Sequence, residues 1–262
     1  MVSEKGAPLI MSQVDRFPTD TELPPPAATG SADWRRNYRN IAAKGDHLLE
    51  HGIYGFNPKD PRAKPFISLR TQVLNALAET KGRIIAVTSP SAANGKSHVA
   101  ANLACAISRV RETILIDLHL RRPVIGYRFG LPEVSGIGSY LKGTDEVSDL
   151  SFRVEDERLT IHAAGEASED SSDLLLSPRL TELFSQNPDG RDLPFCIVDC
   201  PPVLEGDEML LIARRVDSIL FVVEEGRTTK HDLVESFRLL NGAPVLGTLL
   251  NKAMDPLASL HR

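Results

Sequence analysis

Short apolar runs alternate with amphipathic stretches along most of the chain after residue 82. The runs are uniformly apolar, and they read RIIAVT, TILIDL, LTIHAA, FCIVDC, SILFVV and VLGTLL. Between them lie stretches with helical spacing over residues 97–109, 173–187, 207–215 and 228–240. Strands that are apolar on both sides are typical of parallel sheets covered by helices on both faces. The pattern therefore predicts an α/β fold with a doubly wound, mostly parallel sheet.

The first sixty residues lack this alternation. Residues 1–33 are rich in Pro, Ser, Thr and acids, which predicts a disordered tail. Residues 34–49 have helical spacing of their large apolar side chains, and they predict either a solvated surface helix or one that docks on an anionic surface or partner. A Pro-rich linker follows, and Pro65 suits the first turn of a helix that runs to about residue 81. We expect a tail over 1–33, a helical segment and linker over 34–60, and one folded domain over 61–262.

Composition narrows the class of protein. The chain has 262 residues, 42% of them hydrophobic but only 5% aromatic, so its core is aliphatic. A net charge of −5 argues against general nucleic-acid binding. The apolar runs are too short to span a bilayer, and the N-terminus lacks the apolar segment of a signal peptide. The three cysteines lie in apolar patterns that fit reduced core thiols, so we expect a cytoplasmic protein that is not itself transmembrane.

The loop after the first run contains Gly-Lys-Ser. It reads SPSAANGKS from Ser89 to Ser97 and leads into the helical pattern HVAANLACAI. A helix N-terminus offers free N–H groups to phosphate oxygens, Gly95 allows close approach, Lys96 reaches the β- and γ-phosphates, and the Ser97 hydroxyl holds Mg²⁺. Pro90 stands where the full phosphate-loop pattern has its first glycine. The strand–loop–helix context favours a phosphate site over a simple helix start.

Two acids stand at the ends of other predicted strands. Asp117 ends ILID and Asp199 ends FCIVD, where Pro201 and Pro202 then stop the strand. Ligands in such sheets bind beyond the carboxyl ends of the strands, so both carboxylates should lie beside the Lys-Ser loop. For Asp117 the alternative role is a helix N-cap, but Pro123, which suits the start of the next helix, lies too far along the chain. Two acids with such a loop predict a Mg²⁺–nucleotide site.

A further polar residue ends the last strand. Asn251 follows VLGTLL, where its amide either reads a base edge or forms a turn. The expected nucleotide-binding residues are Ala93, Asn94, Gly95, Lys96, Ser97, His98 and Asn251.

Together these residues resemble the bacterial tyrosine kinases (BY-kinases) of capsule and exopolysaccharide export, a family within the P-loop ATPases of the septum-site and plasmid-partition type. The resemblance covers residues 61–253 and rests on LRTQVLNAL, VTSPSAANGKSHVAANLA, ILIDLHLRRP, SSDLLLSPRL, IVDCPPVLEGDEML, LFVVEEGRTTKHDL and LGTLLNKA.

The resemblance implies a role for each site residue. Lys96 and Ser97 would bind ATP and Mg²⁺, and Asn251 would lie near adenine. Asp117 would orient the acceptor tyrosine hydroxyl, Asp199 would hold a metal-bound water, and both acids would join Ser97 around the metal. The implied partners are tyrosine-containing proteins and the cytoplasmic ends of a membrane polysaccharide co-polymerase, which would recruit the chain to the inner face of the membrane.

Two departures from the family lie in the site itself. The loop, usually Pro-Gly-x-Gly-Lys-Ser, has Ala93 at a family glycine, and this alanine costs little if its φ is negative but obstructs the loop if its φ is positive. In the D-x-D-x-R motif His119 replaces the second acid, and an imidazole lacks the oxygen that Mg²⁺ prefers.

Two other departures concern assembly and acceptors. The ring-assembly motif E-x-x-R-x-x-R begins with Lys64 in place of Glu, which predicts weak or non-ring self-association. The C-terminal tyrosine cluster of the family is absent, and the tyrosines present are Tyr38, Tyr54, Tyr127 and Tyr140.

Three functions are compatible with such a fold. The first is an ATP-dependent protein-tyrosine kinase, and the second is an ATP-binding, kinase-like regulatory module with weak or no phosphotransfer. The third is an ATPase that positions cargo. It lacks support because that subgroup has an additional lysine in the loop, and residues 89–94 contain no lysine. The surviving loop and acids favour the kinase, whereas His119 and the missing tyrosines favour the regulatory module.

Overall fold

The sheet has eight strands in the order β1-β4-β5-β3-β6-β2-β7-β8. The computed structural model describes residues 38–42, 45–78, 80, 82–132, 135–185 and 193–253. Adjacent strands are parallel except for the antiparallel pair β4 and β5. This confirms the mostly parallel sheet. The strands are β1 Arg39–Ile41, β2 Ile84–Thr88, β3 Thr113–Asp117, β4 Ser151–Val154, β5 Leu159–His162, β6 Phe195–Asp199, β7 Ser218–Glu224 and β8 Val245–Asn251.

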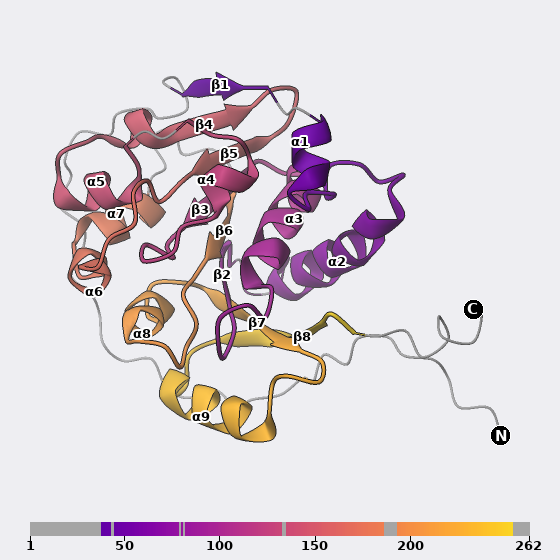
Figure 1. The fold of residues 1–262 in the computed structure, drawn as a ribbon, viewed down its shortest axis with the longest axis vertical. Helices are drawn as coiled ribbons and strands as arrows, with labels where there is room; N and C mark the ends of the chain where they lie inside the picture. The colour runs from indigo at the N-terminus through magenta and orange to yellow at the C-terminus, as the bar shows by residue number, and fades with distance from the viewer. Residues whose placement is uncertain are drawn as a thin grey trace.

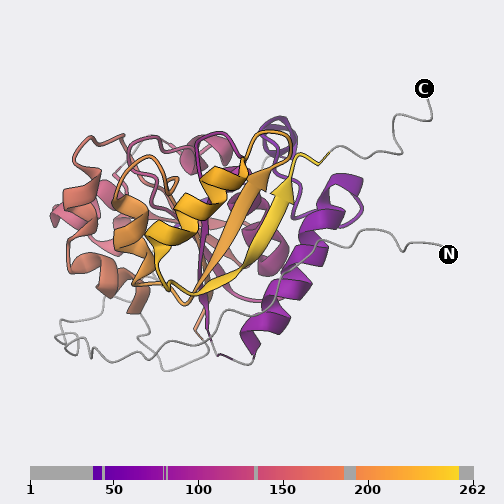
Figure 2. The same cartoon turned by 90° about the horizontal axis from the view of Figure 1, so that it is seen from below.

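Helices cover both faces of this sheet. Figure 1 shows α1, α2 and α3 on one side and α5 to α8 on the other, and Figure 2 shows β7 and β8 between α9 and α2. Among the described residues, no helix combines the length and the apolar composition that crossing a bilayer requires. The α-helices are α1 Gly45–Glu50, α2 Lys64–Ala78, α3 Lys96–Ser108, α4 Ile125–Arg128, α5 Ile137–Lys142, α6 Ser171–Leu175, α7 Arg179–Ser185, α8 Glu208–Ala213 and α9 Lys230–Leu240.

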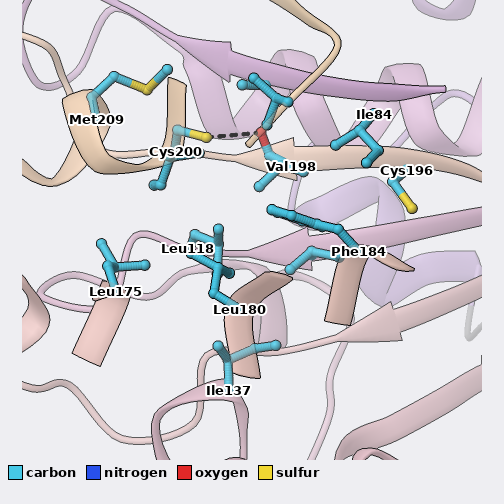
Figure 3. Close-up of a cluster of buried hydrophobic side chains, with 14 of the residues drawn as sticks. Ile84, Leu118, Ile137, Leu175, Leu180, Phe184, Cys196, Val198, Cys200 and Met209 are labelled. Carbon is cyan, nitrogen blue, oxygen red and sulfur yellow. Dashed lines mark hydrogen bonds between the residues drawn. The ribbon is translucent and has the colours of Figure 1, made fainter. Parts of the chain in front are cut away.

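The uniformly apolar strands supply two separate cores. Successive side chains of a strand point to opposite faces, so Ile85 and Val87 pack with α2 and α3 while Ile84 and Ala86 pack with the helices of the other face. Figure 3 shows this second core, in which Ile84 lies among side chains from β6, α7 and α8. All five residues of β2 and of β3 are buried. Double burial explains why these strands show no polar alternation.

The continuous helix expected over residues 34–49 is wrong in its middle part. Residues 39–41 form β1, which pairs in parallel with β4 in the register Arg39 to Phe152 and Ile41 to Val154. A helix forms only from Gly45 to Glu50, and residues 34–37, 43 and 44 lie outside the described part of the chain. Pairing with a distant strand overrode the local helical spacing, as tertiary contacts commonly do. The predicted tail over 1–33 also lies outside the described residues.

One predicted helix is two in the structure. The stretch 173–187 divides into α6, which ends at Leu175, and α7, which begins at Arg179. Pro178 lies at this break. Because a proline lacks a backbone N–H, it cannot continue the hydrogen-bond ladder of the helix. The other predicted helices match α2, α3, α8 and α9 within a few residues at their ends.

A buried asparagine of α3 binds residues 52–55, here called the N-terminal segment, to the rest of the domain. The Oδ1 of Asn102 accepts hydrogen bonds from the backbone N–H of Tyr54 at 2.6 Å and of Gly55 at 3.0 Å. Its Nδ2 donates to the carbonyl of Gly52 at 2.8 Å. Gly55 itself packs so closely on α3 that a Cβ there would lie 2.3 Å from the Asn102 carbonyl oxygen. Asn102 thereby sets the distance between the N-terminal segment and the helix that carries the phosphate loop.

We expect Asn102→Ala to lower the free energy of unfolding by about 2 kcal/mol or more, because it leaves buried backbone groups without partners. Urea titration followed by circular dichroism measures this change. Asn57→Ala is the matched control, since the exposed Asn57 accepts only the nearby N–H of Lys59. It should change stability by less than about 0.5 kcal/mol. Equal effects of the two substitutions would contradict the anchoring role of Asn102.

Candidate functional site

The Gly-Lys-Ser loop connects β2 to α3, as predicted. Gly95 has φ 94°, a left-handed conformation that suits glycine. A Cβ at this position would lie 2.0 Å from the Nδ2 of Asn251, so only glycine leaves room for the amide. Lys96 and Ser97, both buried, form the first turn of α3. The loop therefore presents its lysine, its serine and free helix N–H groups at the carboxyl edge of the sheet.

The conformation of Ala93 resolves the alternative that the sequence left open. Its φ is 64°, in the left-handed region, which costs a residue with a Cβ about 1–2 kcal/mol. Ala93 therefore has the unfavourable one of the two conformations that the sequence left open, and contacts around the loop must offset its strain.

His119 faces the loop lysine. Its Nδ1 lies 3.3 Å from the Nζ of Lys96, and because an ammonium can only donate, the imidazole accepts at Nδ1 and carries its proton on Nε2. Burial, and then the charges of Lys96 and Arg122, lower the pKa of His119 to about 3. The ring is thus neutral at pH 7, and it supplies no negative charge where the family has an acid.

Asp117 is the last residue of β3, and its carboxylate lies at the start of α4. Its Oδ1 accepts the N–H of His119 at 3.0 Å, and its Oδ2 accepts those of Val124 and Ile125 at 3.2 and 3.1 Å. The N-cap residue of α4 is Val124, so Asp117 is not the N-cap, as expected. Its carboxylate nevertheless binds the first N–H groups of α4, because the chain after β3 turns back and brings this helix start to it. Burial, and then the facing charge of Asp199, raise the pKa of Asp117 to about 7 despite these three donors.

Asp199 is the neighbour of Asp117 in the register of β3 and β6. Its carboxylate is fully buried, and neither of its oxygens has a hydrogen-bond partner of ordinary geometry. Burial raises its pKa, while the nearby Lys96 and the Ser97 hydroxyl act in the opposite direction. A buried carboxylate without a partner is unfavourable unless a cation compensates it.

These groups fit a hydrated Mg²⁺ ion. The two orphan oxygens of Asp199, the carboxylate of Asp117 and the Ser97 hydroxyl are the hard oxygen ligands that Mg²⁺ selects. Within the described residues, no cluster of three His, Cys, Asp or Glu side chains forms a protein-only metal cage. Mg²⁺ typically keeps several waters and binds substrate phosphates, so an open site of this kind suits it.

Two expected nucleotide-binding residues make protein contacts. The Nδ2 of Asn251 donates to the Asn94 carbonyl at 2.9 Å, so this amide supports the loop. The ring of His98 packs edge-on against Tyr54 and Phe66, and burial lowers its pKa to about 4. The imidazole of His98 therefore belongs to the packing under the N-terminal segment, and its backbone N–H is the group that stays in the loop–helix junction.

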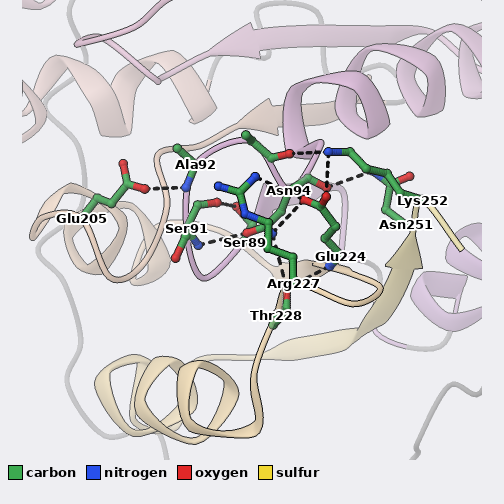
Figure 4. A network of polar contacts seen from close by, with 11 residues as sticks. Ser89, Ser91, Ala92, Asn94, Glu205, Glu224, Arg227, Thr228, Asn251 and Lys252 are labelled. Atoms are coloured by element: carbon green, nitrogen blue, oxygen red, sulfur yellow. Dashed lines mark hydrogen bonds and ion pairs between the residues drawn. The ribbon is translucent and has the colours of Figure 1, made fainter.

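Sequence reasoning missed the residues that hold the loop from outside. Figure 4 shows the contacts of Glu205, Glu224, Thr228 and Lys252 with residues 89–94. Glu205 accepts the N–H of Ala92, and Lys252 donates to the Ala93 carbonyl at 2.9 Å. Glu224 ends β7, and Lys252 follows β8, so the rule that sends attention to strand ends would have found both.

A cleft lies beside the two acids. Its lining includes residues that follow each of them in the chain, namely His119, Arg121, Arg122, Pro201, Pro202 and Glu205. Arg121 is held in this lining by an ion pair and a hydrogen bond. Its Nε lies 2.7 Å from Glu208 Oε1 and 2.9 Å from the Ser171 hydroxyl.

The four tyrosines differ in exposure. Tyr140 is buried and its hydroxyl donates to the Arg179 carbonyl at 3.2 Å, which removes it from the possible acceptors of the folded chain. Tyr54 is partly covered by the Arg62 guanidinium, 4.1 Å from its ring centroid. Tyr127 is 72% exposed and Tyr38 40% exposed.

Comparison with known proteins places this geometry in a family. No protein-family model matches the sequence. EpsB of Ralstonia solanacearum, which is named as a tyrosine-protein kinase, is 31% identical over 216 residues, which make up 81% of this chain and 28% of EpsB. CapB of Staphylococcus aureus, named likewise, is 28% identical over 198 residues, or 74% of this chain and 86% of CapB.

The structural comparison agrees. The kinase domain of the Escherichia coli tyrosine kinase ETK superposes with a TM-score of 0.71 at 27% identity, covering 77% of this chain and 79% of that domain. The chain spans little more than a quarter of the length of EpsB, so the similarity concerns only that part of EpsB. Over this part, the chain belongs to the bacterial tyrosine kinase family.

Proposed function

We propose that this protein is an ATP-dependent protein-tyrosine kinase that regulates the synthesis and export of a capsule or exopolysaccharide. The observation that carries the proposal is the pair Asp117 and Asp199, buried side by side at the ends of adjacent strands and facing the Lys96 loop. Phosphoryl transfer needs this combination of a phosphate cradle and acids that hold a metal ion and orient a nucleophile. The family relationship supports the same reaction.

Each residue has a part in this mechanism. Lys96, Ser97 and the N-terminus of α3 would bind the phosphates, and Ser97 with the two acids would hold Mg²⁺. The bound ion would neutralise charge on the phosphoryl oxygens as the transfer proceeds. Asp117, fixed by three backbone N–H groups, would orient the acceptor tyrosine hydroxyl that enters from the adjacent cleft.

The acceptor and the activator are parts of the same proposal. Tyrosine-containing proteins are the substrates, and the cytoplasmic ends of a membrane polysaccharide co-polymerase are the partner that recruits and activates the chain. Within the chain, Tyr127 and Tyr38 are the tyrosines with the greatest exposure.

A second function is favoured by one specific contact. The neutral ring of His119 occupies the place of a family acid and accepts a hydrogen bond from Lys96. A site that lacks this charge can still bind nucleotide while transferring its phosphoryl group slowly. The alternative is therefore an ATP-binding regulatory module with weak or no phosphotransfer.

Lys96→Met should weaken Mg-ATP or Mg-ADP binding by about ten- to a hundredfold, because it removes a charge-assisted hydrogen bond worth about 1.5–3 kcal/mol. Isothermal titration calorimetry measures the affinity. Lys142→Met, on the exposed end of α5, is the matched control and should bind like the wild type. Equal affinity of the wild type and Lys96→Met would show that the loop is not the site.

His119→Asp should raise the rate of phosphotransfer by about ten- to a hundredfold, since it restores one charge-assisted contact near the metal ion, while ATP affinity changes less. The assay is the initial rate on a tyrosine peptide at saturating Mg-ATP. His119→Asn, which adds an oxygen but no charge, separates the effect of charge from that of size. A wild type as fast as His119→Asp would overturn the metal argument, and inactivity of all variants despite ATP binding would favour the regulatory module.

The isolated chain should be a monomer or dimer in light scattering at micromolar concentration. Lys64 stands where the family has a Glu, and like charges at a ring contact repel. Within the subunit, the Nη1 of Arg70 already donates to the Ala106 carbonyl at 3.3 Å. Lys64→Glu should increase the mass, whereas Lys59→Glu in the exposed linker should not. A ring-sized mass of the wild type that persists in high salt would refute the charge argument.

A further inference from the structure

The phosphate loop carries a strained alanine that its neighbours must hold in place. Ala93 has φ 64°, and without restraint an alanine relaxes to negative φ. Such a change rotates the peptide planes on both sides of the residue. The contacts that fix those planes therefore decide whether the loop keeps its shape.

Of the peptide planes next to Ala93, Lys252 holds the one that follows it, because its Nζ donates to the Ala93 carbonyl at 2.9 Å. The next planes outward are held as well, since Glu205 accepts the N–H of Ala92 and Asn251 donates to the Asn94 carbonyl at 2.9 Å. With both outer planes held, relaxation of Ala93 would turn its carbonyl away from Lys252 and break that bond.

An ion pair with Glu224 holds the Lys252 ammonium at the Ala93 carbonyl. Its Nζ lies 3.1 Å from the Oε1 of Glu224, whose Oε2 accepts from the Nδ2 of Asn94 at 3.3 Å. The backbone N–H of Glu224 donates to the Thr228 hydroxyl at 2.9 Å, which fixes the end of β7 (Figure 4). The hydrogen bond from Lys252 lowers the pKa of Glu224, so the carboxylate stays charged at neutral pH. The ammonium thus bridges the loop carbonyl and an acid that also binds the loop.

We propose that Lys252, aimed by Glu224, is a positioning residue that keeps Ala93 in the left-handed conformation needed by the nucleotide site. The proposal rests on the nucleotide binding proposed above. The Lys252–Glu224 pair thus replaces the effect of the glycine that the family has at position 93. A glycine needs no such restraint, because it adopts positive φ without strain.

The exposure of Lys252 distinguishes this role from a purely structural one. The side chain of Lys252 is 48% exposed, and surface ion pairs add little to global stability. Its removal should therefore change the conformation of the loop far more than the stability of the fold.

The test is a double-mutant cycle between Lys252→Met and Ala93→Gly. Lys252→Met alone should weaken Mg-ADP binding by about tenfold, the factor that corresponds to the strain of a left-handed alanine. In the Ala93→Gly background the same substitution should cost less than about twofold, because glycine no longer needs the restraint. Calorimetric titration gives the four affinities, and the midpoint of thermal unfolding should fall by no more than about 2 °C for Lys252→Met.

Two control variants accompany the cycle. Lys252→Arg keeps a cationic donor and should retain most of the affinity. Lys230→Met, at the start of α9, removes an equal charge on an exposed helix end and should leave the affinity unchanged. An equal loss from Lys252→Met with Ala93 and with glycine at that position would overturn the proposal, since the lysine would then act as a charge on the nucleotide itself.

A second readout works without nucleotide. The amides of Ser91 and Ala92 are hydrogen-bonded to Asn94 and Glu205, so their hydrogen exchange reports local opening of the loop. Lys252→Met should speed this exchange by about tenfold in the free protein. Unchanged exchange would refute the restraint even if nucleotide binds. Failure of the wild type to bind any nucleotide, with faster exchange in Lys252→Met, would instead refute the proposed function and leave the restraint standing.

Discussion

The site depends on two carboxylates that are buried next to each other at the ends of β3 and β6. Neither Asp117 nor Asp199 is exposed to solvent, and two facing negative charges in an aliphatic interior repel each other strongly. The surrounding structure supplies what limits this cost. The first N–H groups of α4 bind Asp117, and the ammonium of Lys96 lies near Asp199. The two oxygens of Asp199 still lack hydrogen-bond partners, and they suit the hydrated divalent cation of the proposed mechanism.

The fold was predictable wherever local pattern and tertiary role coincide. Strands β2, β3 and β6 are buried on both faces, so their uniformly apolar sequences identify them without ambiguity. Strand β1 is a different case, because Arg39 and Asn40 are exposed and nothing in their own sequence favours a strand. Only the partner β4, more than a hundred residues away, gives them that conformation. Edge strands of this kind are determined by pairing, which a single sequence does not display.

The site was predictable to the extent that strand ends converge. That rule predicts that Lys96, Asp117 and Asp199 lie together, and the structure places Asp117 and Asp199 in register. It did not give the orientation of side chains, so it left two roles open for Asn251, to read a base edge or to form a turn, and did not foresee the hydrogen bond to the Asn94 carbonyl. Nor did it give the path of the chain after β3, which brings the start of α4 to Asp117. Both features concern directions in space, which residue spacing leaves undetermined.

Two departures from the family concern different steps of the proposed reaction. Ala93, with Lys252 and Glu224, would affect the shape of the phosphate loop and so the binding of nucleotide. His119 would affect the charge available near the metal ion and so the transfer of the phosphoryl group. Binding and transfer are separable because only interactions that strengthen in the transition state raise the rate. In the proposed reaction the ion pair of Lys252 and Glu224 would therefore affect the binding of nucleotide, and the neutral ring of His119 would affect the rate of transfer.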